Sequence, residues 1–182
     1  MLGVDIRDYG DHNPGATNVL RAGGRRVALL ALFLDYAKAT LPVGLAYLWA
    51  GFDGWHLAAI AVMPVAGHAF SPFLGFHGGK AVAATFGIWT GLTAWEGPSV
   101  LGFLLGIASY LLGANGWAVV AAMAGMMAYF WLTAGGWNGV LYRPPLPVLT
   151  LTWIGNMAIL VYTHRHDLSK PPVLQAVKRQ SP

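Results

Sequence analysis

Long apolar stretches of this 182-residue chain follow a polar first segment and are separated by short links rich in Gly, Pro and Trp. A helix that crosses the hydrocarbon core of a bilayer needs about 20 predominantly apolar residues. By that measure the pattern predicts six membrane-spanning helices, several of them short, with Gly- and Pro-containing breaks between them. The predicted spans are Val27–Ala50, His56–Leu74, Ala81–Trp95, Pro98–Leu112, Trp117–Ala134 and Leu146–Tyr162.

The composition agrees with a membrane protein of one domain, residues 1–182. Hydrophobic residues make up 56% of the chain and charged residues only 10%, whereas a soluble globular domain carries about 25% charged residues. Eight Trp, seven Tyr and eight Phe are enough to form aromatic belts at both membrane interfaces. We therefore predict an all-α polytopic transmembrane helix bundle.

Missing residue types exclude several kinds of chemistry. Because the chain has no cysteine, it forms neither disulfides, nor thiolate metal sites, nor a cysteine acyl intermediate. Its basic residues form no soluble stripe and match no nucleic-acid-binding motif, so we expect no nucleic-acid partner. We also expect a monomer that needs no cofactor and no metal.

Basic residues are distributed unevenly between the two sides of the predicted bundle. Six spans place both termini on one side, and that side also carries nine of the eleven Lys and Arg residues. Arg143 alone falls on the other side, and Lys38 lies inside the first span. The positive-inside rule then puts the first segment, residues 1–26, and the tail, residues 163–182, in the cytoplasm. The nine basic residues are Arg7, Arg21, Arg25, Arg26, Lys80, Arg165, Lys170, Lys178 and Arg179.

The polar segment Gly10–Arg26 has features of an anion-binding site. Its glycines permit positive φ angles and close backbone approach, and turns of successive N–H groups form anion-binding nests. Arg21 and its basic neighbours add donors suited to phosphate. The alternative is a basic juxtamembrane loop that contacts lipid phosphates.

A second polar segment, Gly75–Lys80, ends at the start of the third predicted span. Gly78, Gly79 and Lys80 resemble a small phosphate cradle at a helix N-terminus, although the spacing of a Walker A loop is absent. The alternative is a tight interfacial turn followed by a lysine that extends to the interface.

The third polar segment, Tyr162–Lys170, follows the last span. His164 can serve as a base or orient a substrate hydroxyl. A metal site is the weaker alternative, and it would combine His164, His166 and Asp167 with His68 or His77.

Two charged residues, Asp35 and Lys38, lie three residues apart within the first predicted span. This spacing puts them on one face of a helix. Charges inside a membrane usually pair with one another or line a path. We therefore favour a structural ion pair over a catalytic role.

Taken together, the motifs NPGATNVLR, FLDYAK, GHAFSPFLGFHGGKAVAATFG and HRHDL occur in an order that resembles the PlsY family, bacterial acyl-phosphate:glycerol-3-phosphate acyltransferases. The resemblance covers nearly the whole chain. It implies transfer of a fatty acyl group from acyl phosphate to the 1-hydroxyl of glycerol 3-phosphate, in the bacterial plasma membrane. The products are lysophosphatidic acid and phosphate, the first step of phospholipid synthesis.

The resemblance also implies roles for particular residues. The first motif would hold glycerol 3-phosphate or the acyl phosphate, the second would cradle phosphate, and the histidine of the third would contact glycerol 3-phosphate. Catalytic roles fall to Lys80, His164, Arg21 and Asp11. Substrate binding falls to Asn13, Thr17, Asn18, His68, Gly78, Gly79 and Arg165.

Several positions depart from the family pattern. Asp11 replaces a serine and is able to accept the proton of the attacking hydroxyl. His77 replaces a lysine, Thr163 an arginine and Asp167 an asparagine. The family also has an apolar helix before the first motif, which gives seven spans where this sequence predicts six.

Two other functions compete with the acyltransferase. One is an altered or inactive paralogue that binds phosphate or lipid. The other is a small-solute transporter, which would be expected to show internal repeats or paired broken helices. No convincing repeat is present, and the polar motifs fall on one face of the predicted bundle.

Overall fold

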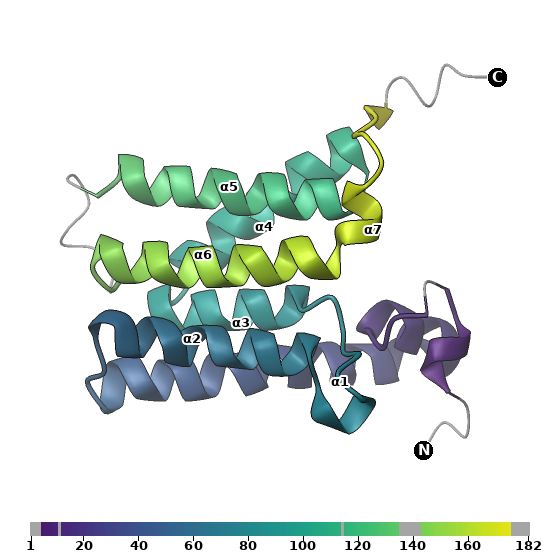
Figure 1. Ribbon diagram of the computed structural model, residues 1–182, viewed down its shortest axis with the longest axis horizontal. Coiled ribbons are helices and arrows are strands. Elements are labelled where there is room, and N and C mark those ends of the chain that lie inside the picture. The colour runs from purple at the N-terminus through teal and green to yellow at the C-terminus, as the bar shows by residue number, and fades with distance from the viewer. Residues whose placement is uncertain (1–4, 11, 114, 135–142, 176–182) are drawn as a thin grey trace.

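A computed structural model describes residues 5–10, 12–113, 115–134 and 143–175. Within these ranges the chain is helical and contains no strand. The helices form an antiparallel bundle (Figure 1). They are α1 (Ala16–Gly44), α2 (Gly54–Ala69), α3 (Val82–Thr93), α4 (Glu96–Leu112), α5 (Gly116–Leu132), α6 (Leu146–Thr163) and α7 (Arg165–Leu168), with 3-10 turns at Ile6–Asp8 and Pro72–Leu74 and a π-helical turn at Leu45–Trp49.

Successive helices from α1 to α6 run in alternating directions (Figure 1). As a result, residues 5–10 and 12–23, the link from α2 to α3, the start of α5 and the short α7 lie at one end of the bundle. We call this the motif end, and the opposite end, where α3 is followed by α4, the far end. The three polar segments of the sequence therefore meet at one end, as predicted.

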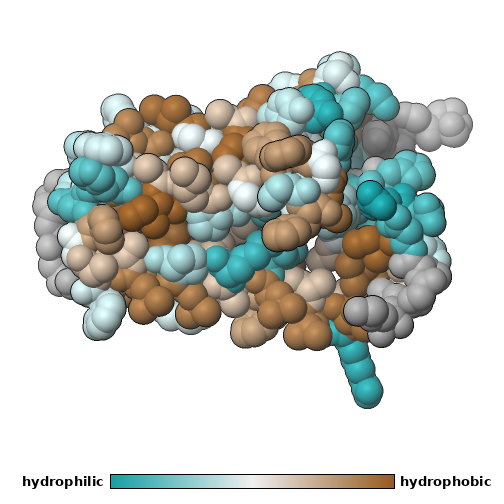
Figure 2. Space-filling view, turned by 60° about the horizontal axis from the view of Figure 1, so that its bottom comes forward, coloured by the Kyte–Doolittle hydropathy of each residue, from teal (hydrophilic) through white to brown (hydrophobic). Residues whose placement is uncertain are grey.

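The predicted all-α fold class is confirmed, and an apolar helix lies at each of the six predicted places. In the described ranges, three helical segments are long and apolar enough to cross a membrane, Ala16–Trp49, Gly54–Leu74 and Leu146–Thr163. The other three helices, α3, α4 and α5, are apolar but shorter. Large apolar side chains of α1, including Leu29, Phe33 and Leu41, are exposed, and Figure 2 shows apolar residues over much of one face. Such a surface suits contact with lipid.

The first helix begins earlier than the sequence pattern predicts. Helix α1 starts at Ala16, not at Val27, so most of Gly10–Arg26 is helix instead of a loop. Gly24 interrupts the helical geometry with φ 76° and ψ 178°, a conformation that glycine adopts at little cost. A prediction based on hydrophobicity did not assign the polar residues before this break to a helix, because they form a helix without being apolar.

Small residues allow α3 to lie close to α1. A Cβ atom built at Gly87 would lie 2.7 Å from the Cβ of Ala39, and one at Gly91 would lie 2.9 Å from the Cβ of Val43. Small residues at such contacts are typical of membrane helix packing. On its other side, α3 is tied to α6, since the buried Trp89 donates through Nε1 to Asn156 Oδ1 at 3.1 Å. These contacts fix the position of α3, which begins two residues after Lys80.

Candidate active site

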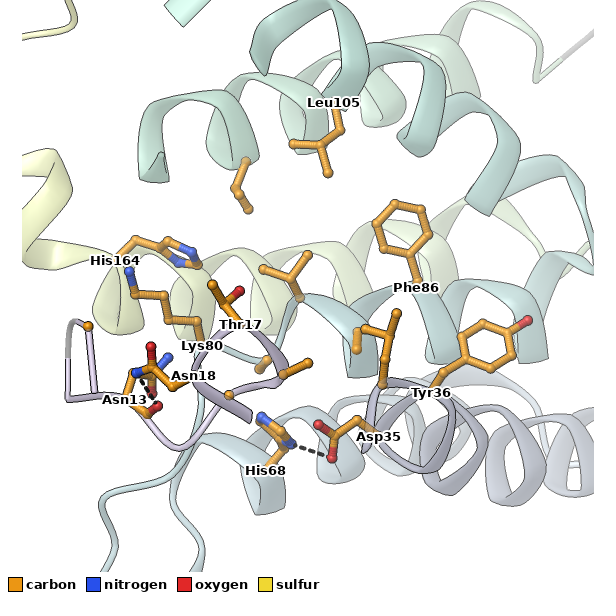
Figure 3. Close-up of a pocket in the computed structure, with 18 of the residues that line it drawn as sticks. Asn13, Thr17, Asn18, Asp35, Tyr36, His68, Lys80, Phe86, Leu105 and His164 are labelled. Atoms are coloured by element: carbon orange, nitrogen blue, oxygen red, sulfur yellow. Dashed lines mark hydrogen bonds and ion pairs between the residues drawn. The ribbon is translucent and has the colours of Figure 1, made fainter. Parts of the chain in front are cut away.

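A cavity of about 1160 Å³ opens at the motif end of the bundle. One part is polar and the other apolar, and the two are continuous (Figure 3). The polar lining residues include Asn13, Thr17, Asn18, Arg21, Asp35, Tyr36, His68, Lys80, Ser109, Asn115, His164 and Asp167. The apolar wall includes Leu29, Leu32, Phe33, Phe86, Leu105 and Val119. The cavity can therefore accept a molecule with a charged head and a hydrocarbon chain.

The N-terminal wall of the cavity orients Arg21. The side chain of the buried Asn18 donates through Nδ2 to the carbonyl oxygen of Asn13 at 2.9 Å. Its Oδ1 in turn accepts from Arg21 Nη1 at 3.0 Å. Gly10 lies against the same guanidinium, and a Cβ at this position would collide with it. Because a guanidinium carries several N–H donors in a fixed plane, this arrangement leaves Arg21 able to bind an anion as well.

The two glycines before Lys80 hold the backbone against the end of α2. Gly78 N donates to the Ala69 carbonyl at 3.0 Å, and Gly79 N donates to the His68 carbonyl at 3.1 Å. A Cβ on either glycine would collide with this end of α2. In this structure the two N–H groups donate to carbonyls of α2, and a phosphate cradle at these glycines stays a prediction. The glycines act by placing Lys80.

Lys80 reaches the cavity at the junction of three helices. Its backbone carbonyl accepts from Thr163 Oγ1 at the end of α6, at 3.3 Å. Its Nζ lies 3.5 Å from Asp167 Oδ2. Ala81, the next residue, has φ 62°, an uncommon value for a residue with a Cβ. Tertiary contacts hold this strained turn in place, and strain of this kind is often found at functional sites.

His164 is buried at the end of α6 and faces the same cavity. Figure 3 shows its ring beside the Lys80 side chain. Its Nδ1 lies 2.9 Å from the carbonyl oxygen of Leu160. Since a carbonyl oxygen only accepts hydrogen bonds, Nδ1 carries the proton, and Nε2 is the acceptor in the neutral ring. This tautomer suits a residue that orients a hydroxyl or accepts its proton.

His68 belongs to a three-residue cluster between α1 and the end of α2. Lys38 Nζ lies 2.7 Å from Asp35 Oδ1 and 2.8 Å from His68 Nδ1. His68 Nδ1 is also 3.3 Å from Asp35 Oδ1, the contact drawn in Figure 3. The predicted pairing of Asp35 with Lys38 is present, and the histidine joins it. Because Lys38 balances the carboxylate, the cluster contributes little net charge to the cavity.

Seven predicted site residues line the cavity, and three do not. Those that line it are Asn13, Thr17, Asn18, Arg21, His68, Lys80 and His164. Gly78 and Gly79 are not part of the lining and lie against the end of α2, as described above. Arg165 is not part of the lining, because its Nη1 donates to the Tyr162 carbonyl at 2.9 Å and its guanidinium lies over the Tyr162 ring. Asp11 falls outside the described residues.

Some departures from the family pattern can also be placed. His77 is exposed, with Nδ1 2.7 Å from the Gly75 carbonyl, and Asp167 lines the cavity. The alternative metal site is not assembled in the described ranges, where no group of three or more His, Asp or Glu side chains could hold an ion.

Sequence reasoning missed several residues that line the cavity. Tyr36 follows Asp35 on α1, and its hydroxyl donates to Thr90 Oγ1 at 3.0 Å. Ser109 and Asn115 come from the end of α4 and the start of α5. The segment GANGW, which contains Asn115, carries no charge and gave no signal. For Asp35 the signal was its position inside an apolar span.

Comparison with known proteins identifies the family of this chain. The family model described as glycerol-3-phosphate acyltransferase matches residues 1–171. This chain belongs to that family. The glycerol-3-phosphate acyltransferase 1 of Thermotoga maritima is 37% identical, over 93% of this chain and 86% of the relative. The enzyme of Thermus thermophilus is 38% identical, over 92% of this chain and 78% of the relative.

Solved structures agree with the family membership. The glycerol 3-phosphate form of the crystal structure of PlsY, an integral membrane glycerol 3-phosphate acyltransferase, has a TM-score of 0.76 and 28% identity. The alignment covers 98% of this chain and 87% of the PlsY chain. The lysophosphatidic acid form has a TM-score of 0.73 and 30% identity, over 88% and 76% of the two chains. The predicted family, the acyltransferase class and the integral membrane fold are confirmed.

Proposed function

We propose that this acyltransferase transfers a fatty acyl group from acyl phosphate to the 1-hydroxyl of glycerol 3-phosphate, giving lysophosphatidic acid and inorganic phosphate. The observation that carries the proposal is the continuity of the cavity. Its polar part holds Lys80 and Arg21, and its apolar wall comes from α1, α3, α4 and α5. A fatty acyl donor with a phosphate head needs both parts. The glycerol 3-phosphate and lysophosphatidic acid forms of PlsY support the choice of acceptor and product.

Each substrate has a complementary part of the cavity. The acyl chain lies along the apolar wall, near Phe86 and Leu105. The phosphate groups lie at the polar part, where Lys80 and Arg21 supply positive charge and Asn13, Thr17 and Asn18 supply hydrogen bonds. Charged donors of this kind bind phosphate more strongly than neutral ones.

The reaction needs little beyond positioning and charge stabilisation. The hydroxyl oxygen of the acceptor attacks the acyl carbon and forms the ester bond, while the bond from that carbon to the phosphate oxygen breaks. Acyl phosphate is a mixed anhydride and already activated, so holding both substrates together supplies much of the rate. Lys80 and Arg21 stabilise the charge that develops on the departing phosphate.

The proton of the attacking hydroxyl needs an acceptor. His164 is suited to orient the hydroxyl or take the proton through Nε2, because its Nδ1 already donates to the Leu160 carbonyl. Asp11 remains a second candidate from the sequence. Neither role requires a cofactor, and we propose that the enzyme acts as a monomer.

We place the active site on the cytoplasmic side of the bacterial plasma membrane. Arg7, Arg21, Lys80 and Lys170 belong to the motif end of the bundle, whereas Arg143 lies at the far end, shortly before α6. A cytoplasmic motif end follows from the positive-inside rule.

Product identification tests the proposal. Protein purified in detergent and shown to be folded is given palmitoyl phosphate and glycerol 3-phosphate, and the lipid product is identified by mass spectrometry. We expect lysophosphatidic acid acylated at the 1-position, with one phosphate released per acyl group transferred. Folded protein that makes no such product would contradict the proposal and favour an inactive paralogue that binds phosphate or lipid.

A further inference from the structure

A carboxylate occupies the cationic part of the proposed active site. Asp167 Oδ2 lies 3.5 Å from Lys80 Nζ and 3.2 Å from Gly116 N, the first residue of α5. The side chains of Asp167 and Lys80 are 32% and 35% exposed, and both line the cavity. The pair therefore faces the space where a phosphate is proposed to bind.

Asp167 also completes the N-terminus of α5. Asn115 Oδ1 accepts from Trp117 N at 3.0 Å and from Ala118 N at 3.2 Å, and Asp167 accepts from the remaining N–H of this turn, that of Gly116. A helix N-terminus attracts anions through such N–H groups and through the helix dipole. The carboxylate thus holds two contacts that a phosphate at this point would use, one to a lysine and one to a helix N-terminus.

The charge balance of the cavity makes this contact consequential. Among the described residues, Arg21 and Lys80 are the Lys and Arg side chains that line the cavity. The other lining carboxylate, Asp35, is balanced by Lys38 at 2.7 Å. Asp167 therefore cancels one of two lining cations, although both proposed substrates carry phosphate.

We propose that Asp167 sets the phosphate affinity of the site, as an internal anion that substrate phosphate must displace from Lys80 and from the N-terminus of α5. It lowers the affinity of this part of the cavity for phosphate groups and so favours release of the phosphate product. The identity of the phosphate compounds rests on the proposed function, but the competition between carboxylate and phosphate can be measured without turnover.

Asp167→Asn tests the competition while conserving the contact with α5. The amide oxygen of asparagine can still accept from Gly116 N, so the variant removes the charge and keeps the cap. Binding of inorganic phosphate to the purified protein is measured by isothermal titration calorimetry at low salt. We expect the dissociation constant to fall about fivefold, in line with the modest strength of partly exposed ion pairs and of charges at helix ends.

Two further variants serve as controls, and a third repeats the main test. Asp167→Glu keeps the charge and should bind phosphate within about twofold of the wild type, and so should Asp53→Asn, which removes an exposed carboxylate at the far end. Asp167→Ser, whose hydroxyl can also accept from Gly116 N, repeats the main test if the asparagine variant folds poorly. Raising the salt concentration should reduce the difference between Asp167→Asn and wild type, because exposed charges are screened.

Steady-state kinetics then show which phosphate meets Asp167. A lower KM for glycerol 3-phosphate in Asp167→Asn assigns the site to the acceptor, and a lower KM for acyl phosphate assigns it to the donor. Unchanged phosphate binding in both Asp167→Asn and Asp167→Ser would overturn the inference, as would an equal gain in Asp53→Asn. If the wild type shows no acyl transfer but Asp167→Asn still binds phosphate more tightly, the proposed function fails and this inference stands.

Discussion

Two ion pairs at opposite ends of the bundle differ in how far their side chains are exposed. At the far end, Arg143 Nη1 lies 2.9 Å from Glu96 Oε1, and these side chains are 11% and 2% exposed. At the motif end, Lys80 and Asp167 are 3.5 Å apart and about one third exposed. The far-end pair is enclosed by protein, whereas the motif-end pair faces the cavity.

The far-end pair is surrounded by further bonds. Glu96 Oε1 also accepts from the Tyr129 hydroxyl at 3.1 Å. Arg143 donates to Thr133 Oγ1 at 3.1 Å and to the Thr133 carbonyl at 2.8 Å. These bonds connect the start of α4, the end of α5 and the residues before α6. A closed cluster of this kind holds helices together, whereas a long and exposed pair can exchange its partner for a substrate.

Arg143→Ala should give the largest effect, on stability. Removing the arginine leaves the Glu96 carboxylate buried without its cation, which costs about 3–5 kcal/mol in free energy of unfolding. Thermal unfolding in detergent measures the loss, and the specific activity of the protein that remains folded should change little. Adding Glu96→Gln should restore part of the stability, because it removes the uncompensated charge. An unfolding midpoint equal to that of the wild type would show that the far-end cluster is not structural.

Lys80→Ala should have the opposite effect, a large loss of activity with little loss of stability. Loss of a positioned charge that stabilises the departing phosphate typically lowers the rate about 100- to 1000-fold. We expect kcat/KM to fall by this factor while the unfolding midpoint stays near that of the wild type. Lys170→Ala, which removes an exposed cation at the same end, is the control and should retain activity. Comparable activity in the two variants would contradict the proposed role of Lys80 in the active site.

Arg21→Lys asks whether shape matters in addition to charge. The substitution keeps one positive charge but loses the planar guanidinium that Asn18 Oδ1 orients. We expect kcat/KM to fall about tenfold, since bidentate binding of phosphate is lost. Arg26→Lys, on the same helix but exposed and outside the cavity, should leave it unchanged. Equal rates for wild type and Arg21→Lys would mean that this position contributes only charge.

Asn156→Ala should have the smallest effect and tests a closed polar cluster without charge. Asn156 accepts from Trp89 Nε1 at 3.1 Å and donates to Thr85 Oγ1 at 2.9 Å. Hydrogen bonds between membrane helices contribute about 0.6 kcal/mol on average. We expect a loss of roughly that size per bond, visible as a small drop in the unfolding midpoint. A loss as large as that of Arg143→Ala would show that burial, and not charge, sets the strength of the closed clusters.

The sequence predicted the helices and the meeting of the polar segments because both follow from one-dimensional patterns. Apolar runs mark spans, and their even number brings the motifs to one end. It did not predict that Gly78 and Gly79 donate to the last carbonyls of α2, because the folding of the link back onto the end of α2 leaves no hydrophobic pattern in the sequence. The direction of the Arg165 side chain could not be predicted either, since it depends on the neighbouring Tyr162 ring.

Asp167 shows a further limit of the sequence. Its change from the family's asparagine to a carboxylate was visible in the sequence. Its contact with Gly116 N could not be predicted, because 51 positions separate the two residues and only the packing of α7 on α5 brings them together. Conversely, the resemblance supplied a chemistry that the arrangement of the residues alone would have left open.

Phosphate release from acyl phosphate alone tests most directly the central claim, that one cavity holds donor and acceptor together for direct transfer. The purified enzyme is mixed with palmitoyl phosphate without acceptor, and inorganic phosphate is followed from the first turnover. We predict no burst of phosphate until glycerol 3-phosphate is added. When both substrates are varied, we predict that the double-reciprocal plots of initial rate against substrate concentration give intersecting lines. A stoichiometric burst in the absence of acceptor, with parallel lines, would reveal an acyl-enzyme and contradict direct transfer.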